Sequence, residues 1–558
     1  MKLTKKLTLA SIALLSFTLS YALSIAHPAL TQTGEKRERE IVVIIPSYNN
    51  KDWYEKNLNS VFMQKYENYK VIYINDKSPD GTGKLVQDYI RKIKQEHRFT
   101  LINNPKNTGA LANIYKAVHT CDDNTIIVTI DGDDWLKDEY VFQKINETYQ
   151  DPNIWMTYGQ YQELHYSKKH NKYFTKKGHC GQIKPNIIRA HAYREDRWIT
   201  SHLRTFYAGL FKQIKLQDFL EDSQFYQVTW DMAFMMPMLE MAKGKFKFID
   251  DVLYVYNCVT PINDFKTKLI KQLHLEHVIR AKEKYKPTKT PLKKYTQDAR
   301  ADIIIISQNS PTHLQATLES IEFYVSGEKN IYVLYEEKNN QVNQDIQQDI
   351  HQNIQTVAND FNYVTFVPHN NLKISLQEIL STCDSTYILI AKDNIIVKDF
   401  VNLKKCSQLL DQTYAYGFYF SLGKNIQENS ALARKQHIAP HTEIKYGVYA
   451  WQFKDGEHDW KMPNNLLMTM YKKETILKTL KNIEYQTCQD LETRINKQNF
   501  DANQVGLFFE NSKVIAIAPD KPDGADGMKI DILPLFLSKN SSILLKTGLS
   551  FCEREDLD

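Results

Sequence analysis

Residues 41–130 alternate between short apolar runs rich in β-branched residues and longer, helix-length stretches. The apolar runs, of which Ile41–Ile45 is the clearest, are typical of strands buried on both faces, as in a parallel sheet. Strands that alternate with helices predict βαβ units in an open, doubly wound α/β sheet. We expect strands at 41–45, 70–74, 98–103 and 125–130, with helices at 52–64, 83–95 and 109–119.

The second half of the chain repeats this pattern. The buried run Asp302–Ile306 begins 261 positions after Ile41, and the run that begins at Thr386 lies 261 positions after Thr125. A constant spacing across several elements predicts two tandem copies of one α/β domain. Residues 282–300 lie between the copies, and their lysine-rich, proline-punctuated composition indicates a linker.

The first residues have the composition of an N-terminal targeting segment. Three lysines, the last of them Lys6, precede Leu7–Ala26, which carries no charge. A positive start, an apolar run and small residues at its end predict a signal peptide, and the run is also long enough for a single-pass signal anchor. We therefore expect an exported or membrane-attached protein, with any membrane association through this segment.

These patterns divide the chain into four parts. We predict residues 1–34 as the targeting segment with its spacer, 35–281 as the first α/β domain, 282–300 as the linker and 301–558 as the second domain with a C-terminal tail.

Composition excludes several other classes of protein. The 71 Lys and Arg nearly balance the 66 Asp and Glu, which gives a net charge of +5 with no basic tail. Nucleic-acid binding proteins concentrate positive charge in patches, so nucleic acid is not an expected partner. The seven cysteines are dispersed and form no C-x-x-C pair, which argues against a disulfide framework and a structural zinc site.

The motif Asp131-Gly132-Asp133-Asp134 directly follows the strand predicted at 125–130. Two carboxylates one residue apart at a strand end can share a hard divalent cation such as Mg²⁺, which completes its coordination with water and phosphate oxygens. Binding sites in doubly wound sheets lie at the carboxyl ends of the strands. The position of this motif therefore favours a metal site over an acidic turn.

The other predicted strands also end in polar residues. Pro46-Ser-Tyr-Asn49 follows the first strand, Asn75–Asp80 the second, and Asn107-Thr-Gly109 the third. Each segment alone is consistent with an ordinary turn. Together they predict one crevice with an aromatic ring, carboxylate and amide acceptors, and a glycine that permits close approach, which suits a nucleotide diphosphate.

The ordered motifs over residues 41–265 resemble the inverting glycosyltransferases of family 2, which have the GT-A fold, a Rossmann-like nucleotide-diphospho-sugar transferase fold. The family's P-x-Y-N, N-x-G and D-x-D-D motifs correspond to Pro46–Asn49, Asn107–Gly109 and Asp131–Asp134. Its D-D-x-S-x-D motif corresponds to Asn75–Asp80, in which Asn75 replaces the first aspartate.

The resemblance implies a role for each matched residue. Tyr48 and Asp76 would hold the base of a nucleotide sugar, typically uracil, while Asp131 and Asp133 would hold the ribose, the diphosphate and a Mn²⁺ or Mg²⁺ ion. Asp131 and Asp133 are thus the expected metal ligands. The residues expected to bind the nucleotide sugar are Pro46, Tyr48, Asn49, Asp76, Asn107, Gly109 and Asp131.

The acceptor side needs a base. Asp231, in Thr229-Trp-Asp-Met, resembles the family's catalytic acidic residue at the start of a helix. With an ordinary pKa near 4, such a carboxylate must accept the proton as the new bond forms. His202 and Arg204 resemble a subgroup motif, in which Arg204 would grip a phosphate or an acidic sugar.

The second copy lacks the acidic motif. The offset of 261 places Lys392 at the position of Asp131 and Asn394 at that of Asp133. We therefore expect a degenerate GT-A-like domain that serves acceptor binding or stability. Trp451 and Trp460 indicate either a carbohydrate-binding surface or core packing.

The sequence thus predicts a metal-dependent transferase that moves a sugar from a nucleotide sugar, with UDP as the expected carrier, to a hydroxyl of a glycan or surface polysaccharide. The alternative from another class is an exported, non-catalytic glycan-binding protein built from two GT-A copies. A sugar-phosphate nucleotidyltransferase is disfavoured because Pro46–Asn50 is not a glycine-rich phosphate loop.

Overall fold

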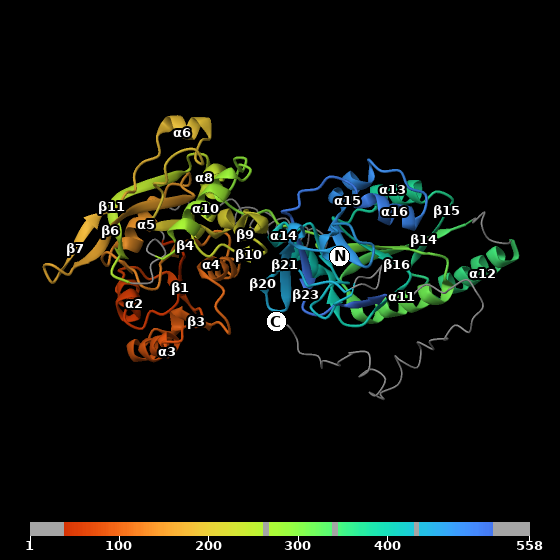
Figure 1. Cartoon of the computed structure of the whole chain (residues 1–558), viewed down its shortest axis with the longest axis horizontal. Coiled ribbons are helices and arrows are strands. Elements are labelled where there is room, and N and C mark those ends of the chain that lie inside the picture. The colour runs from red at the N-terminus through yellow and green to blue at the C-terminus, as the bar shows by residue number, and fades with distance from the viewer. Residues whose placement is uncertain (1–37, 261–266, 338–343, 429–434, 517–558) are drawn as a thin grey trace, which may run out of the picture.

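The structure, a computed structural model, describes residues 38–260, 267–337, 344–428 and 435–516. Two α/β lobes lie side by side, one for each half of the chain (Figure 1). They meet near α10 (Leu269–Ala281), α14 (Leu403–Thr413) and the hairpin formed by β9 (Leu220–Glu221) and β10 (Gln224–Phe225). The predicted targeting segment at 7–26 lies outside the described residues. Within the described ranges, every helix is too short or too polar to cross a bilayer.

The first lobe contains a nine-stranded sheet whose main path has the order β3-β2-β1-β4-β8-β6-β11-β5, with β7 paired to β6. Its core is four parallel strands, β1 to β4, and β8 is antiparallel to β4. The strands are β1 (Ile41–Ser47), β2 (Tyr69–Asn75), β3 (Phe99–Asn103), β4 (Ile126–Thr129), β5 (Trp135–Leu136), β6 (Met156–Ser167), β7 (Lys172–Lys177), β8 (Arg204–Tyr207) and β11 (Phe246–Asn257).

Helices connect these strands where the sequence predicts them. The helices are α2 (Tyr54–Phe62), α3 (Thr82–Ile93), α4 (Ala110–Val118), α5 (Val141–Thr148), α6 (Pro185–Ala190), α7 (Ala208–Phe211), α8 (Trp230–Ala242) and α10 (Leu269–Ala281). A short hairpin, β9 (Leu220–Glu221) and β10 (Gln224–Phe225), precedes α8. All seven residues of β1 are buried, as its uninterrupted apolar run predicts. The predicted mixed α/β fold is confirmed.

The second lobe has a sheet of order β15-β14-β12-β16-β22-β19-β23-β21-β20. Its four core strands are again parallel, and β22 is antiparallel to β16 as β8 is to β4. The strands are β12 (Ala301–Ile306), β14 (Glu328–Glu336), β15 (Thr365–His369), β16 (Tyr387–Lys392), β19 (Gly417–Tyr419), β20 (Thr442–Lys445), β21 (Val448–Gln452), β22 (Thr469–Lys472) and β23 (Val505–Phe509).

The helices of the second lobe are α11 (Pro311–Tyr324), α12 (Gln344–Asp360), α13 (Leu372–Thr382), α14 (Leu403–Thr413), α15 (Lys473–Leu480) and α16 (Cys488–Ile495). Three small two-stranded sheets complete the described structure: β9 with β10, β13 (Val325–Ser326) with β18 (Val401–Asn402), and β17 (Ile395–Val397) with β24 (Val514–Ala516). The six described cysteines are all free thiols.

The segment between the lobes is in contact with both of them. It contains neither helix nor strand between the end of α10 and the start of β12. Lys293 is nevertheless buried, and its ammonium group donates to the carbonyl of Lys212 in the first lobe at 3.0 Å and to that of Asp411 in the second at 2.7 Å. The predicted linker therefore also holds the two lobes together.

Candidate active site

The loop after β4 carries the acidic motif and is clamped from α2. The side-chain amide of Asn57, which is fully buried, donates to the carbonyls of Asp131 at 3.0 Å and Asp134 at 2.7 Å. The amide of Asp134 in turn donates to the carbonyl of Asp131 at 3.0 Å. These bonds fix a tight turn that leaves Asp131 and Asp133 partly exposed at the carboxyl end of β4.

Asp134 anchors this loop to β11. One carboxylate oxygen accepts the Tyr254 hydroxyl at 2.6 Å, and the other accepts the backbone N–H of Asn257 at 2.7 Å. Burial raises the pKa of Asp134 well above its ordinary range, and the neighbouring carboxylates of Asp133 and Asp131 raise it further. Such crowding of carboxylates favours a bound cation at this loop.

Gly132 permits the acidic loop to lie against the end of β1. A Cβ at this position would lie 2.7 Å from Ser47 Oγ and would also collide with the side-chain amide of Asn50. The backbone N–H of Gly132 donates to the carbonyl of Pro46 at 3.2 Å. The predicted motifs at the ends of β1 and β4 are therefore in direct contact.

Asp76 connects the end of β2 to the loop before α4. Its carboxylate, which is buried, accepts the backbone N–H groups of Thr108 at 3.0 Å and Gly109 at 2.8 Å. The side-chain amides of Asn104 and Asn107 bond to its carboxylate and its carbonyl, at 2.7 and 3.2 Å. Asp76 thus positions the loop that would face the nucleotide, in addition to any contact with the base.

The remaining predicted donor-site residues lie at the end of β1. Tyr48 exposes 42% of its surface, which leaves its ring available to stack on a base. Asn49 has a left-handed backbone (φ 59°), and its N–H donates to Ser78 Oγ at 3.0 Å. This bond ties the P-x-Y-N segment to the turn after β2.

Asp231 lies in the first turn of α8 and is brought to the site by an ion pair with Arg204. The guanidinium Nη1 is 3.2 Å from Asp231 Oδ2, and Arg204 is only 2% exposed. Arg204 stands on β8 beside Thr129, near the end of β4, and its guanidinium lies 5.3 Å from the centre of the Trp230 ring. Arg204 therefore positions the proposed base.

His202 lies beside the acidic loop. One ligand atom each from Asp131, Asp134 and His202 lie within 4.8 Å of one another, which is compatible with a shared metal ion. The His202 ring stacks on Tyr254 with centroids 4.6 Å apart. Burial lowers the pKa of His202 well below its ordinary value, and the Arg204 cation lowers it further, so the imidazole is neutral and able to bind a cation.

The supporting roles of three residues of this site were not predicted from the sequence. Asn57, Asn104 and Tyr254 hold the loops through side-chain hydrogen bonds to distant segments, and nothing in the sequence shows that they would take this role. The structure joins the segments that follow β1 and β4 at Gly132, and it places Arg204, the ion-pair partner of Asp231, beside Thr129 at the end of β4.

The corresponding loop of the second lobe has different chemistry. Lys392, at the position of Asp131, forms an ion pair with Glu492 at 2.8 Å. Trp451 and Trp460 are both fully buried, with ring centroids 5.2 Å apart. Of the two interpretations of these tryptophans, core packing is correct, and they offer no ring face to a glycan.

Comparison with known proteins supports the resemblance to a glycosyltransferase family. Residues 42–215 match the family model described as glycosyl transferase family 2. The chain is 30% identical over 111 residues to glycosyltransferase GlyA of Streptococcus pneumoniae serotype 4 (strain ATCC BAA-334 / TIGR4), a match that covers 19% of this chain and 15% of GlyA.

A longer match is to glycosyltransferase GlyG of the same organism, with 24% identity over 219 residues, which cover 39% of this chain and 70% of GlyG. Among solved structures, residues 1–349 of S. aureus TarS in complex with UDP-GlcNAc match with 14% identity and a TM-score of 0.32, covering 43% of this chain and 66% of that one. Residues 42–215 of this chain form a domain of glycosyltransferase family 2.

Proposed function

We propose that the chain is a metal-dependent, inverting glycosyltransferase that moves a sugar from a UDP-linked donor to a hydroxyl group of a glycan or surface polysaccharide. The observation that carries this proposal is the contact between the clamped Asp131–Asp134 loop and the segment that follows β1, which is itself bonded to the turn after β2. Binding sites in doubly wound sheets lie at this edge.

On the donor side, Tyr48 would stack on the base, and the loop that Asp76 holds would line the nucleotide. Asp131 and Asp133, with Asp134 and His202 behind them, would hold Mn²⁺ or Mg²⁺. When bound, such an ion neutralises the negative charge that develops on the departing diphosphate. The exposed carboxylates and the buried, neutral imidazole are compatible with that role.

On the acceptor side, Asp231 would accept the proton of the attacking hydroxyl. The acceptor oxygen forms a bond to the anomeric carbon while the bond from that carbon to the diphosphate oxygen breaks, so the configuration inverts. A positioned base of this kind contributes about 10²–10⁴-fold to the rate. The ion pair with the buried guanidinium of Arg204 orients Asp231 for this step.

A screen of nucleotide-sugar hydrolysis and transfer with Mn²⁺ and Mg²⁺ tests the proposal. The full chain should turn over at least one donor only when the metal is present, and Asp133→Ala should abolish that turnover. Asp231→Asn should lower kcat by about 10²-fold or more without weakening nucleotide binding. No turnover and no metal-dependent nucleotide binding would favour the alternative of a non-catalytic glycan-binding protein.

We also propose that the second lobe is a degenerate copy of the first, without transferase activity of its own. The matching order of the first seven strands along each sheet and the nearly constant spacing in sequence support this proposal. Calorimetric titration of nucleotide into variants of the full chain that are altered in the first or in the second lobe tests this proposal.

A further inference from the structure

The β9–β10 hairpin of the first lobe is inserted into the second lobe. Its tip residues Asp222 and Ser223 both have left-handed backbones (φ 50° and 58°), and Ser223 is fully buried. The Ser223 N–H donates to the side chain of Gln452 at 3.1 Å, and its hydroxyl donates to Asp455 at 2.7 Å. The hairpin is therefore a fixed bridge between the lobes.

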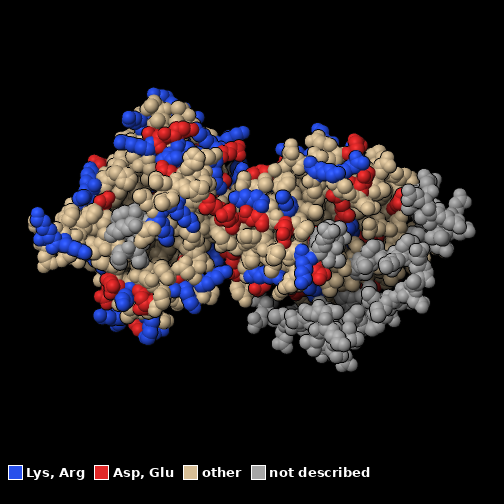
Figure 2. Space-filling model, viewed as in Figure 1, with Lys and Arg blue, Asp and Glu red and all other residues tan. Residues whose placement is uncertain are grey.

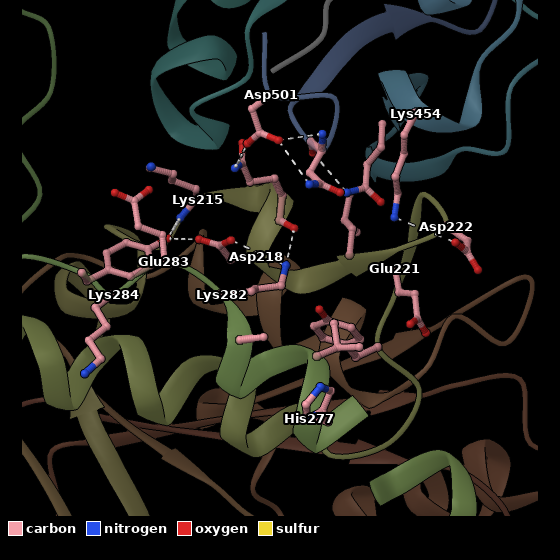
Figure 3. A pocket seen from close by; sticks show the side chains of 18 of the residues that line it. Lys215, Asp218, Glu221, Asp222, His277, Lys282, Glu283, Lys284, Lys454 and Asp501 are labelled. Carbon is pink, nitrogen blue, oxygen red and sulfur yellow. Dashed lines mark hydrogen bonds and ion pairs between the residues drawn. The ribbon is translucent and has the colours of Figure 1, made fainter. Parts of the chain in front are cut away.

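Two cavities flank this hairpin. The larger, of about 790 Å³, is shown in Figure 3, and the smaller has a volume of about 490 Å³. Glu221, Asp222 and Tyr226 line both cavities. Figure 2 shows acidic and basic side chains close together along this junction. Both volumes fall in the range of about 300–1,000 Å³ that is typical of small-molecule sites.

Two lysines that line the larger cavity are paired with carboxylates of the same cavity. Lys282 lies 3.5 Å from Asp218, and Lys454 lies 4.0 Å from Asp222 across the junction (Figure 3). A ligand in the larger cavity would have to compete with these ion pairs for the four side chains.

The smaller cavity, which we call the interdomain cleft, adjoins the candidate active site. Its walls include Lys106, Asn107 and Thr108 of the loop that Asp76 holds, and Glu443 on β20 of the second lobe. β20 also packs against α4, the helix that this loop begins. The cleft thus brings the second lobe to the edge of the predicted donor site.

The cleft also adjoins the segment that leads to Asp231. Gln227 lines it, lies four residues before Asp231, and has its side-chain amide 2.8 Å from the position that a Cβ on Gly109 would occupy. A ligand in the cleft would therefore lie beside both the donor loop and the start of the helix that carries the proposed base.

The lining of the cleft suits a ligand rich in hydroxyl groups. Lys106 and Lys271 are exposed, and neither has an ion-pair partner among the described residues. Tyr226 is 2% exposed, and its hydroxyl has no hydrogen-bond partner in the described structure. A buried donor left without a partner costs about 1–3 kcal/mol, which a ligand hydroxyl could recover.

We propose that the interdomain cleft binds the glycan acceptor, so that the second lobe supplies one wall of the acceptor site. This inference rests on the proposed transferase function. Lys271 on α10 and Glu443 on β20 would hydrogen-bond acceptor hydroxyls from opposite lobes.

The test uses p-nitrophenyl glycosides of glucose, galactose and N-acetylglucosamine as acceptors with the full chain. Lys271→Ala and Glu443→Gln should each raise KM for the glycoside about tenfold, as loss of one hydrogen bond to a charged group predicts. Donor hydrolysis without acceptor should stay within about twofold of wild type. Lys286→Ala, at an exposed residue that lines only the larger cavity, is the matched control and should change neither quantity.

Calorimetric binding of the same glycosides, which needs no turnover, separates the two proposals. Binding that the cleft variants weaken, in a chain without donor turnover, would contradict the transferase function and keep the cleft as a glycan site. Donor hydrolysis without glycoside binding or transfer, or an unchanged KM in both cleft variants, would overturn the cleft proposal. Circular dichroism of each variant confirms that it is folded.

Discussion

The loops that follow β4 and β16 can be compared through the helix side chains that hold them. In the first lobe, the Asn57 amide donates to the carbonyls of Asp131 and Asp134. In the second, the Thr317 hydroxyl lies 2.9 Å from the carbonyl of Asp393 and 2.8 Å from that of Ile395. Asn57 and Thr317 are 260 positions apart, so equivalent helices clamp equivalent turns.

A second contact repeats with the same spacing. Ser60 Oγ accepts the N–H of Leu136 at 3.0 Å, and Ser320 Oγ accepts the N–H of Val397 at 3.0 Å. These matched contacts support the proposed duplication more strongly than strand order alone, because they involve individual side chains in equivalent roles.

The side chains presented by the two turns differ. Gly132 has no side chain, and the end of β1 packs against it. At the equivalent position, the carboxylate of Asp393 accepts the Ser307 hydroxyl at 2.6 Å and the N–H of Gln308 at 2.8 Å. The second lobe therefore carries a carboxylate at the position where the first lobe has Gly132, which has no side chain. Under the proposed duplication, the second lobe keeps the turn but not the acidic side chains of the first.

The largest expected effect concerns the tryptophans of the second lobe. Trp460→Ala should lower the free energy of unfolding by about 3–5 kcal/mol, because it removes a fully buried aromatic side chain. Chemical denaturation measures this loss. A stable variant with weakened glycan binding would instead mean that the ring faces a ligand, and the two lobes would then share a sugar-binding role.

The next effect concerns Gly132. Gly132→Ala should reduce transfer by about 10²-fold, since a Cβ there displaces the end of β1 by collision with Ser47. The matched variant Asp393→Ala in the second lobe should leave the transfer rate unchanged. Equal losses in both variants would mean that both turns take part in catalysis.

A smaller effect concerns the pH dependence of stability, to which a buried histidine of the first lobe should contribute. Burial lowers the pKa of His119, near the end of α4, to about 3. In the unfolded chain its pKa is about 6.5, so the unfolded state binds the proton first and stability falls as the pH drops below about 6.5. We expect His119→Gln to reduce the loss of stability between pH 7 and 5 by about 2 kcal/mol. An unchanged pH dependence of thermal unfolding would contradict this.

The smallest expected effect is that of Lys392→Ala. The ion pair of Lys392 with Glu492 is partly exposed, so its loss should cost about 0–1 kcal/mol of stability. Donor hydrolysis should be unchanged. A large fall in hydrolysis would show that this lysine takes part in the reaction.

Much of the fold could be predicted from the sequence because the buried strands are continuous apolar runs. The strand expected at 70–74 is β2, Tyr69–Asn75, and the helix expected at 109–119 is α4, Ala110–Val118. The strand ends were predictable for the same reason, since Gly, Asn, Asp and Pro follow each apolar run and mark where it stops.

The supporting side chains could not be predicted in this way. Asn57 bonds to a loop 74 positions away, and Tyr254 bonds to Asp134 across 120 positions. A single polar residue in a helix or strand gives no periodic signal, so only the folded arrangement reveals such partners. The insertion of the β9–β10 hairpin into the second lobe, where Ser223 bonds to Gln452, could likewise not be predicted from the sequence.

One measurement tests the central claim that nucleotide chemistry belongs to the first lobe alone. UDP is titrated calorimetrically into the full chain with and without Mn²⁺, using wild type, Asp133→Ala and the matched variant Asn394→Ala. We predict metal-dependent binding in wild type and Asn394→Ala, and its loss in Asp133→Ala. Binding retained in Asp133→Ala, or lost in Asn394→Ala, would contradict the account.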